Sequence, residues 1–186
     1  MKIYKIDIDQ NETRLVLPDI EGLEILKYKI FDGKKKADFW KDSIWYIFNP
    51  TLTATNFLSF GTTSALVFDQ KVYDSELYDI LERAGEILPI TIKKENYYVL
   101  NITEIINVLD EEKTTWELLE DNTKGDITEY SFLKNRFTNS SLFKIPETYT
   151  TEIFVHSDTK VFEEEFYTLY KKLNFTGLIF NKVYSE

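Results

Sequence analysis

The sequence of 186 residues contains no cysteine, one histidine, six glycines and four prolines. Without cysteine the chain has no disulfide scaffold, no thiolate zinc site and no cysteine nucleophile. The single histidine, His156, excludes multi-histidine metal sites, and its place at the end of an apolar strand is typical of a structural or exposed residue. The six glycines form no phosphate-binding loop. These absences leave no recognisable catalytic centre, and we expect neither a metal nor another cofactor.

Long apolar runs are also missing from the sequence. The first ten residues, MKIYKIDIDQ, alternate charged and apolar side chains, so they have the character of neither a signal peptide nor a membrane anchor. We therefore expect a cytoplasmic protein with no membrane partner.

Aromatic and acidic side chains are abundant. Fourteen Phe, 12 Tyr and 3 Trp supply enough apolar surface for one globular domain over residues 1–186. Thirty-two acidic residues against 22 basic ones give a net charge of −10, which repels nucleic-acid phosphates and favours a basic partner. Solubility alone is the alternative explanation for the excess of acid.

Residues 1–63 have the patterns of a strand-rich portion. Ile6 and Ile8 alternate with aspartates, which is typical of a half-buried strand. Residues 14–17 and 23–31 predict two further strands, and the three lysines at 34–36 predict a solvated loop.

The most aromatic segment is residues 39–48, FWKDSIWYIF, which predicts a strand pair or an amphipathic hairpin. Its tryptophans, Trp40 and Trp45, are either core anchors or part of a partner-binding patch. Both interpretations stay open because tryptophan is frequent in cores and at interface hot spots.

Residues 64–186 predict an α+β portion with two main helices. A cap of Asp74 or Ser75 begins the first helix, which ends before Gly85. Its buried stripe consists of Leu77, Ile80, Leu81 and Ala84. A cap of Ser157 or Asp158 begins the second, which runs to about Leu173.

Between the helices we expect strands at residues 88–92, with Pro89 near the start where a missing donor is tolerated, and at residues 97–101. A short helix capped by Asn101 or Thr103 then runs through Leu109, and a closing strand covers residues 178–184. The predicted fold is α+β, with antiparallel N-terminal strands and a mixed sheet on which the two main helices pack.

The order of elements in residues 85–110, GEILPITIKKENYYVLNITEIINVLD, resembles a bacterial family of immunity proteins from polymorphic-toxin systems. This is the type-eleven group, formerly described as a domain of unknown function. SLFKIP at 141–146, EIFVHSD at 152–158 and FTGLIF at 175–180 are similar to further parts of that family, so the resemblance covers residues 64–183. It implies a non-enzymatic protein that binds and neutralises a cognate toxin, with no catalytic residues to carry over.

Candidate partner-binding residues lie on either side of Trp116. They are Asp110, Glu111, Glu112, Trp116, Glu120 and Asp121, together with Trp40 and Trp45. Acidic groups around an exposed tryptophan suit docking on a basic toxin surface. The alternative is a solvated loop whose tryptophan packs inward.

Two other function classes stay open. Carboxylate pairs such as Asp7 and Asp9 suit a carboxylate-dependent hydrolase, although such pairs arise by chance at this acid content. The aromatic segment 39–48 suits a structural subunit of a larger assembly.

Overall fold

The computed structural model of the protein describes residues 1–9, 12–18, 31–40, 45–60, 64–157 and 164–186. The strands are β1 (Lys2–Ile8), β2 (Val16–Pro18), β3 (Trp45–Ile47), β4 (Phe57–Leu58), β5 (Leu66–Asp69), β6 (Gly85–Ile92), β7 (Glu95–Ile102), β8 (Thr115–Leu118), β9 (Lys124–Glu129), β10 (Leu142–Phe143), β11 (Ile153–Ser157) and β12 (Leu178–Ser185). The helices are α1 (Gln70–Tyr73), α2 (Tyr78–Ala84) and α3 (Phe166–Lys172), and the 3-10 turns are η2 (Ala37–Phe39), η3 (Lys134–Arg136) and η4 (Pro146–Thr148). Within the described ranges, no helix is both long and apolar enough to cross a membrane.

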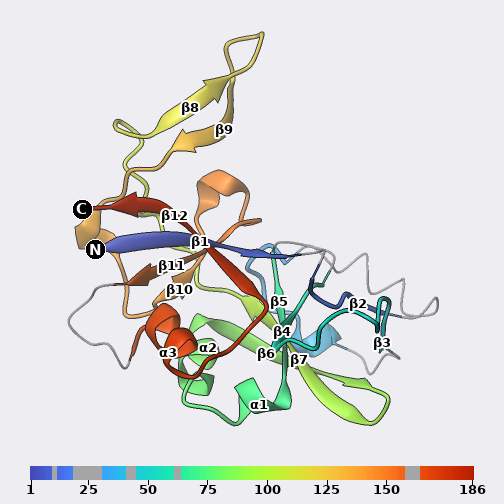
Figure 1. Cartoon of the computed structure of the whole chain (residues 1–186). Coiled ribbons are helices and arrows are strands. Elements are labelled where there is room, and N and C mark those ends of the chain that lie inside the picture. The colour runs from blue at the N-terminus through green and yellow to red at the C-terminus, as the bar shows by residue number, and fades with distance from the viewer. Residues whose placement is uncertain (10–11, 19–30, 41–44, 61–63, 158–163) are drawn as a thin grey trace.

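Two four-stranded sheets form the frame of the molecule (Figure 1). The first has the order β10-β11-β1-β12 and the second the order β4-β5-β7-β6, while β2 pairs with β3 and β8 with β9. All pairings between the described strands are antiparallel, and parallel pairing is confined to isolated bridges such as that of Ile105 with Lys144. The predicted α+β class is confirmed, but the sheet beneath the helices is antiparallel rather than mixed.

Strand β1 lies inside the first sheet, between two strands from the far end of the chain. Lys2 is opposite Ser157 of β11 on one side and Ser185 of β12 on the other. In the second sheet, β4 from the first third of the chain pairs with β5. Both sheets therefore combine strands from residues 1–63 and 64–186.

Each sheet has a core cluster on both of its faces, because successive side chains of a strand point to opposite faces. Leu66 and Phe68 of β5 pack in a core cluster shared with the three helices and one face of the first sheet, whereas Val67 packs on the opposite face. That opposite face is covered by N-terminal residues that include Trp45. The outer face of the first sheet is covered by residues between Ile106 and Phe137.

The first main helix is confirmed as α2, which buries Ile80, Leu81 and Ala84, but its predicted cap is wrong. The N-cap residue is Leu77, with no side-chain cap, and Asp74 instead ends α1. This additional short helix, α1, precedes α2 because the Asp69 side chain accepts a hydrogen bond from the Val72 amide and caps that turn. Gly85 ends α2 and also begins β6, so helix and strand meet without a loop.

The predicted short helix through Leu109 is wrong. Asn101 and Ile102 are instead the last residues of β7, paired with Glu86 and Gly85. Beyond them the chain stays extended, with Ile106 and Val108 buried and Asn107 exposed between them. This alternation has the period of a strand, and the β-branched side chains favour it.

The predicted start of the second main helix is also wrong. Ser157 is the last residue of β11, and α3 begins at Phe166. The Phe166 amide donates to the Ser141 hydroxyl at 2.9 Å, so the cap comes from another part of the chain. Asp158, the other predicted cap, lies outside the described residues.

Four smaller predictions have mixed outcomes. The closing strand is confirmed as β12, whereas Pro89 lies within β6 rather than at its start. A proline is tolerated there because β6 is at the edge of its sheet. The strand predicted at residues 23–31 lies outside the described residues except for Phe31. Residues 41–44 of the segment 39–48 also lie outside them, whereas residues 45–47 form β3, which pairs with β2.

Candidate functional site

The hairpin formed by β8 and β9 projects away from the two sheets (Figure 1). Trp116 is opposite Ile127 and Leu118 is opposite Lys124, with irregular register between these pairs. Its loop is held by Asp121, whose carboxylate accepts hydrogen bonds from the amide and the hydroxyl of Thr123 at 3.0 and 2.6 Å. The hydroxyl bond, followed by the amide bond, lowers the pKa of Asp121 and keeps the loop negatively charged. The predicted partner-binding residues from Asp110 to Asp121 thus belong to, or directly precede, one projecting hairpin.

The acidic hairpin, which we define as residues 110–129, carries most of the net charge of the protein. It contains eight acidic residues and two lysines, so its net charge is −6 out of −10 for the whole chain. Lys113 pairs with Asp110 at 3.1 Å and Lys124 with Glu111 at 3.7 Å. Glu112, Glu117 and Glu120 have exposed side chains and no ion pair among the residues that the structure describes.

Two leucines at the end of the hairpin are exposed among these acids. Leu118 is 66% exposed and Leu119 is 48% exposed. Leu119 closes the loop through backbone hydrogen bonds with Asn122 and Thr123. These two adjacent leucines offer apolar area for a partner to cover.

Trp116 joins the hairpin to the body of the protein. Its ring is half-buried against the third core cluster, which includes Ile3 and Phe154, and the Lys124 ammonium lies 4.7 Å from the ring centre. The ring therefore packs inward in part, and its role in binding a partner stays a prediction.

A cavity of about 280 Å³ lies at the foot of the hairpin. Its lining comes from β1, from β8, from β9 with the residue that follows it, and from the segment 147–152. The lining residues are Lys5, Trp116, Gly125, Asp126, Ile127, Tyr130, Glu147, Thr148, Tyr149, Thr151 and Glu152. Sequence reasoning missed this cavity because its lining comes from four separate parts of the chain.

One carboxylate of this cavity already has its partners. Glu152 accepts from the Lys5 ammonium at 3.0 Å and from the Tyr130 hydroxyl at 2.7 Å. Burial favours a neutral Lys5, but the hydrogen bond and the charge of Glu152 outweigh it and raise the pKa of Lys5. Burial, followed by the same carboxylate, raises the pKa of Tyr130.

The other two predicted binding residues, Trp40 and Trp45, lie in a different cluster, on the second sheet. Trp45 is 3% exposed, and its ring lies 5.9 Å from that of Trp40. The Trp40 indole donates to the Pro89 carbonyl at 2.8 Å. Their contacts anchor the N-terminal segment on β6, so we do not include them in the candidate surface.

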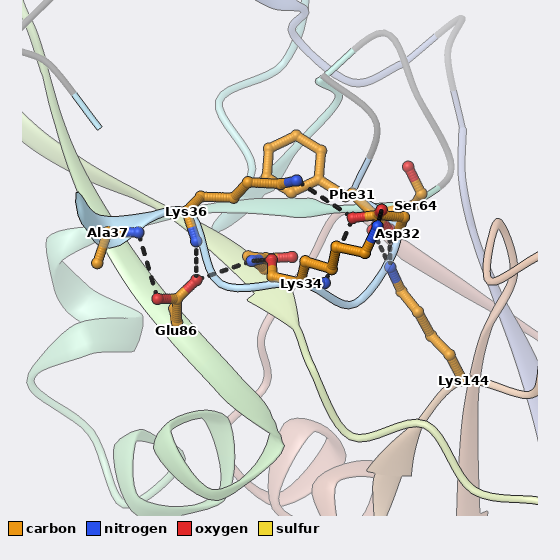
Figure 2. Close-up of polar contacts among 9 residues, drawn as sticks. Phe31, Asp32, Lys34, Lys36, Ala37, Ser64, Glu86 and Lys144 are labelled. Carbon is orange, nitrogen blue, oxygen red and sulfur yellow. Dashed lines mark hydrogen bonds and ion pairs between the residues drawn. The ribbon is translucent and has the colours of Figure 1, made fainter. Parts of the chain in front are cut away.

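A second polar cluster was also missed by the sequence interpretation. The Lys144 ammonium is fully buried and donates to the carbonyls of Phe31 and Ser64 at 2.6 and 2.7 Å (Figure 2). Removal of the ammonium from water lowers the pKa of Lys144 to about 8, although the nearby Asp32 opposes this shift.

Lys34 and Lys35 are exposed, as the predicted solvated loop requires, whereas Lys36 is partly buried and held by this cluster. Asp32 pairs with Lys36 at 3.1 Å, and the Glu86 carboxylate accepts from the Lys36 amide at 2.6 Å and from the Asn101 side chain at 2.9 Å (Figure 2). Since Lys144 is enclosed by protein atoms, we assign the cluster a structural role.

His156 is buried rather than exposed. Its ring lies between Phe137 and Phe143, and its Nε2 atom is 3.2 Å from the Ser140 carbonyl. Burial lowers the pKa of His156 and favours the neutral ring. Over the described ranges, no three His, Cys, Asp or Glu side chains gather in an arrangement that could hold a metal ion.

No protein-family model matches this chain, and a comparison with curated proteins finds no match either.

Proposed function

We propose that the protein is a non-enzymatic immunity protein that binds a basic toxin through the acidic hairpin and neutralises it by covering an essential surface. The observation that carries the proposal is the concentration of charge, since residues 110–129 hold a net −6 of the chain's −10 on a projecting element. The resemblance of residues 64–183 to the immunity family supports the same function.

The hairpin combines the two features that a fast and durable complex needs. Exposed acids such as Glu112, Glu117 and Glu120 attract a basic surface and raise the association rate. Leu118 and Leu119 offer apolar contact area that is removed from water on docking, which slows dissociation. Because exposed charges are screened by salt, the association rate is expected to fall as ionic strength rises.

The test is neutralisation of the toxin encoded beside the gene for this protein. We expect the wild-type chain to restore growth to cells that express the toxin. A triple variant, Glu112→Lys, Glu117→Lys and Glu120→Lys, is expected to slow association with the toxin at least about tenfold at low salt, because it removes the steering field. Surface plasmon resonance at two salt concentrations measures this change.

A matched control separates the hairpin from the net charge of the molecule. The triple variant Glu12→Lys, Asp38→Lys and Asp79→Lys makes the same change of charge at exposed residues outside the hairpin. If both triple variants slow association equally, the hairpin is not the contact surface. If the wild-type chain neither binds nor neutralises the toxin, the immunity function itself is wrong.

A further inference from the structure

The first sheet ends on one side in a long edge strand, β12. It pairs with β1 along residues 178–185, and no strand of the described part of the chain lies beyond it. The other edges of the two four-stranded sheets are short or covered. Strands β10 and β4 have two residues each, and β6 contains Pro89, whose carbonyl accepts from the Trp40 indole. Free edges pair readily with other chains, and β12 is the long edge that is neither covered nor interrupted by proline.

Alternate residues of β12 point their backbone groups away from β1. The Leu178 amide donates to the Tyr170 hydroxyl at 3.1 Å rather than to β1, so Leu178 belongs to the outward set. By the alternation of an antiparallel ladder, Phe180 and Lys182 belong to it as well. Among the described residues, none outside β1 bonds to the backbone of residues 179–185. The outward N–H and C=O groups of Phe180 and Lys182 are therefore available to another strand.

This edge is nearly neutral in a strongly acidic protein. Residues 178–185, LIFNKVYS, contain Lys182 as their one charged side chain, whereas the whole chain has a net charge of −10. Ile179 is 41% exposed, and Phe180 is half-buried beside Tyr167 of α3. A basic partner finds no acid along this strand, whereas a second copy of the chain can approach along it without opposing a row of like charges. A lysine on an edge commonly prevents pairing, so the position of Lys182 decides which register is possible.

We propose that two copies of this chain associate through β12, which pairs antiparallel with itself and joins the two first sheets into one continuous sheet. The two-fold axis passes between the two Phe180 residues, which exchange backbone hydrogen bonds. The Lys182 amide of each copy donates to the Leu178 carbonyl of the other, and the Leu178 amide keeps its bond to Tyr170. In this register the two Lys182 residues are about 14 Å apart along the strands, beyond the roughly 8 Å over which exposed charges act at physiological salt.

The dimer has a predictable dependence on salt. The axis is perpendicular to the joined sheets, so both copies place the face that carries the acidic hairpin on the same side. Repulsion between two acidic chains opposes association, and salt screens this repulsion, so the dimer is expected to strengthen as ionic strength rises. Toxin binding through the hairpin is expected to weaken instead. The proposal concerns β12 alone and does not rest on the immunity function.

Sedimentation equilibrium of the full chain is the first experiment. The interface is small, so we expect a reversible dimer with a dissociation constant on the order of 10 to 100 µM. Between about 0.05 and 0.5 M NaCl this constant is expected to fall at least about threefold. A chain that stays monomeric up to about 500 µM at the higher salt concentration contradicts the proposal.

The matched variants are Lys182→Pro and Lys182→Ala. Both remove the exposed lysine side chain, but only proline also removes the outward N–H, which β1 does not use. We expect Lys182→Pro to weaken dimerisation at least about tenfold and Lys182→Ala to change it less than about threefold. Circular dichroism and thermal unfolding show whether each variant is folded. Equal dimerisation of the two folded variants would mean that this edge is not the interface.

A second measurement does not depend on a proline. Because the chain has no cysteine, one introduced cysteine carries one spin label. Labels on Lys182→Cys are expected to lie about 15 Å apart across the axis and to broaden the electron paramagnetic resonance spectrum of the dimer. Labels on Thr91→Cys, which is exposed on the edge strand β6 of the second sheet, are expected to cause no broadening. Broadening at Thr91 alone, or at neither position, overturns the proposal.

The outcomes also separate the dimer from the proposed function. If the chain dimerises through β12 but neutralises no toxin, the pairing of β12 stands and the immunity function fails. If a chain that stays monomeric at every concentration neutralises the toxin, the pairing of β12 fails and the immunity function stands.

Discussion

The variant Lys144→Met is expected to be less stable than the wild-type protein by an amount that increases with pH. At pH 9.5 we expect a loss of about 2 to 4 kcal/mol, because the carbonyls of Phe31 and Ser64 lose the buried donor that Lys144 provides. At pH 7.5 the expected loss is smaller by about 2 kcal/mol. Urea unfolding at both pH values measures the difference.

The direction of this pH dependence follows from the lowered pKa of Lys144. In the folded protein this pKa is about 8, whereas the ordinary value is 10.5, so between these values the unfolded chain binds more protons than the folded one. The free energy of unfolding therefore rises with pH across this range and gains about 2 kcal/mol between pH 7.5 and 9.5. A neutral amine still has two N–H donors, which is enough for the two carbonyls.

Methionine has nearly the same volume as lysine, so this substitution does not leave a large cavity. The variant Lys35→Met is the control, because it removes an exposed lysine from the neighbouring segment. The upper limit of pH 9.5 avoids the tyrosines, whose raised pKa values affect stability above pH 10. A loss of stability that is the same at both pH values, or that shrinks as pH rises, would contradict the assignment of Lys144.

The variant Gly177→Ala is expected to destabilise the protein by about 3 kcal/mol or more. Gly177 has a φ angle of 107°, and a Cβ atom placed on it would lie 2.1 Å from the Phe57 carbonyl oxygen. Both the backbone conformation and the contact exclude a side chain, since a main-chain atom cannot move aside as a flexible side chain can. Denaturant unfolding of the purified variant measures the loss.

Gly125→Ala is the matched control for this substitution. A Cβ atom there would meet the end of the Leu119 side chain at 3.2 Å, which can shift, so we expect a change within about 0.5 kcal/mol. Equal stability of the two variants would mean that the close approach of residues 57 and 177 is not maintained in solution.

The sequence predicts those elements whose determinants are local. The buried stripe of α2 and the strand β1 are both predicted from a short window, and both are present, although the two buried residues of β1, Ile3 and Ile6, lie three positions apart. The sequence after Asn101 predicts a helix because Asn101 and Thr103 are residue types that favour the N-terminal cap of a helix, whereas the segment is extended. Pairing of Asn101 and Ile102 with β6 overrides that preference, and the partner strand cannot be identified from the segment itself.

Long-range contacts determine the features that the sequence interpretation missed. The cap of α3 comes from Ser141, and the donor that holds Phe31 comes from Lys144, which is 113 positions further along the chain. The acids around Trp116 were identified because they are close together in sequence. Their cavity was not, because Glu147 and Lys5 reach it from distant segments.

The place of β1 has a consequence for the order in which the chain folds. A ribosome makes β1 long before it makes both neighbours of this strand, β11 and β12. During synthesis β1 therefore has neither of its partners, whereas β5, β6 and β7 emerge together and can pair at once. The second sheet is expected to form on the nascent chain, and the first sheet to close only after β12 has been released.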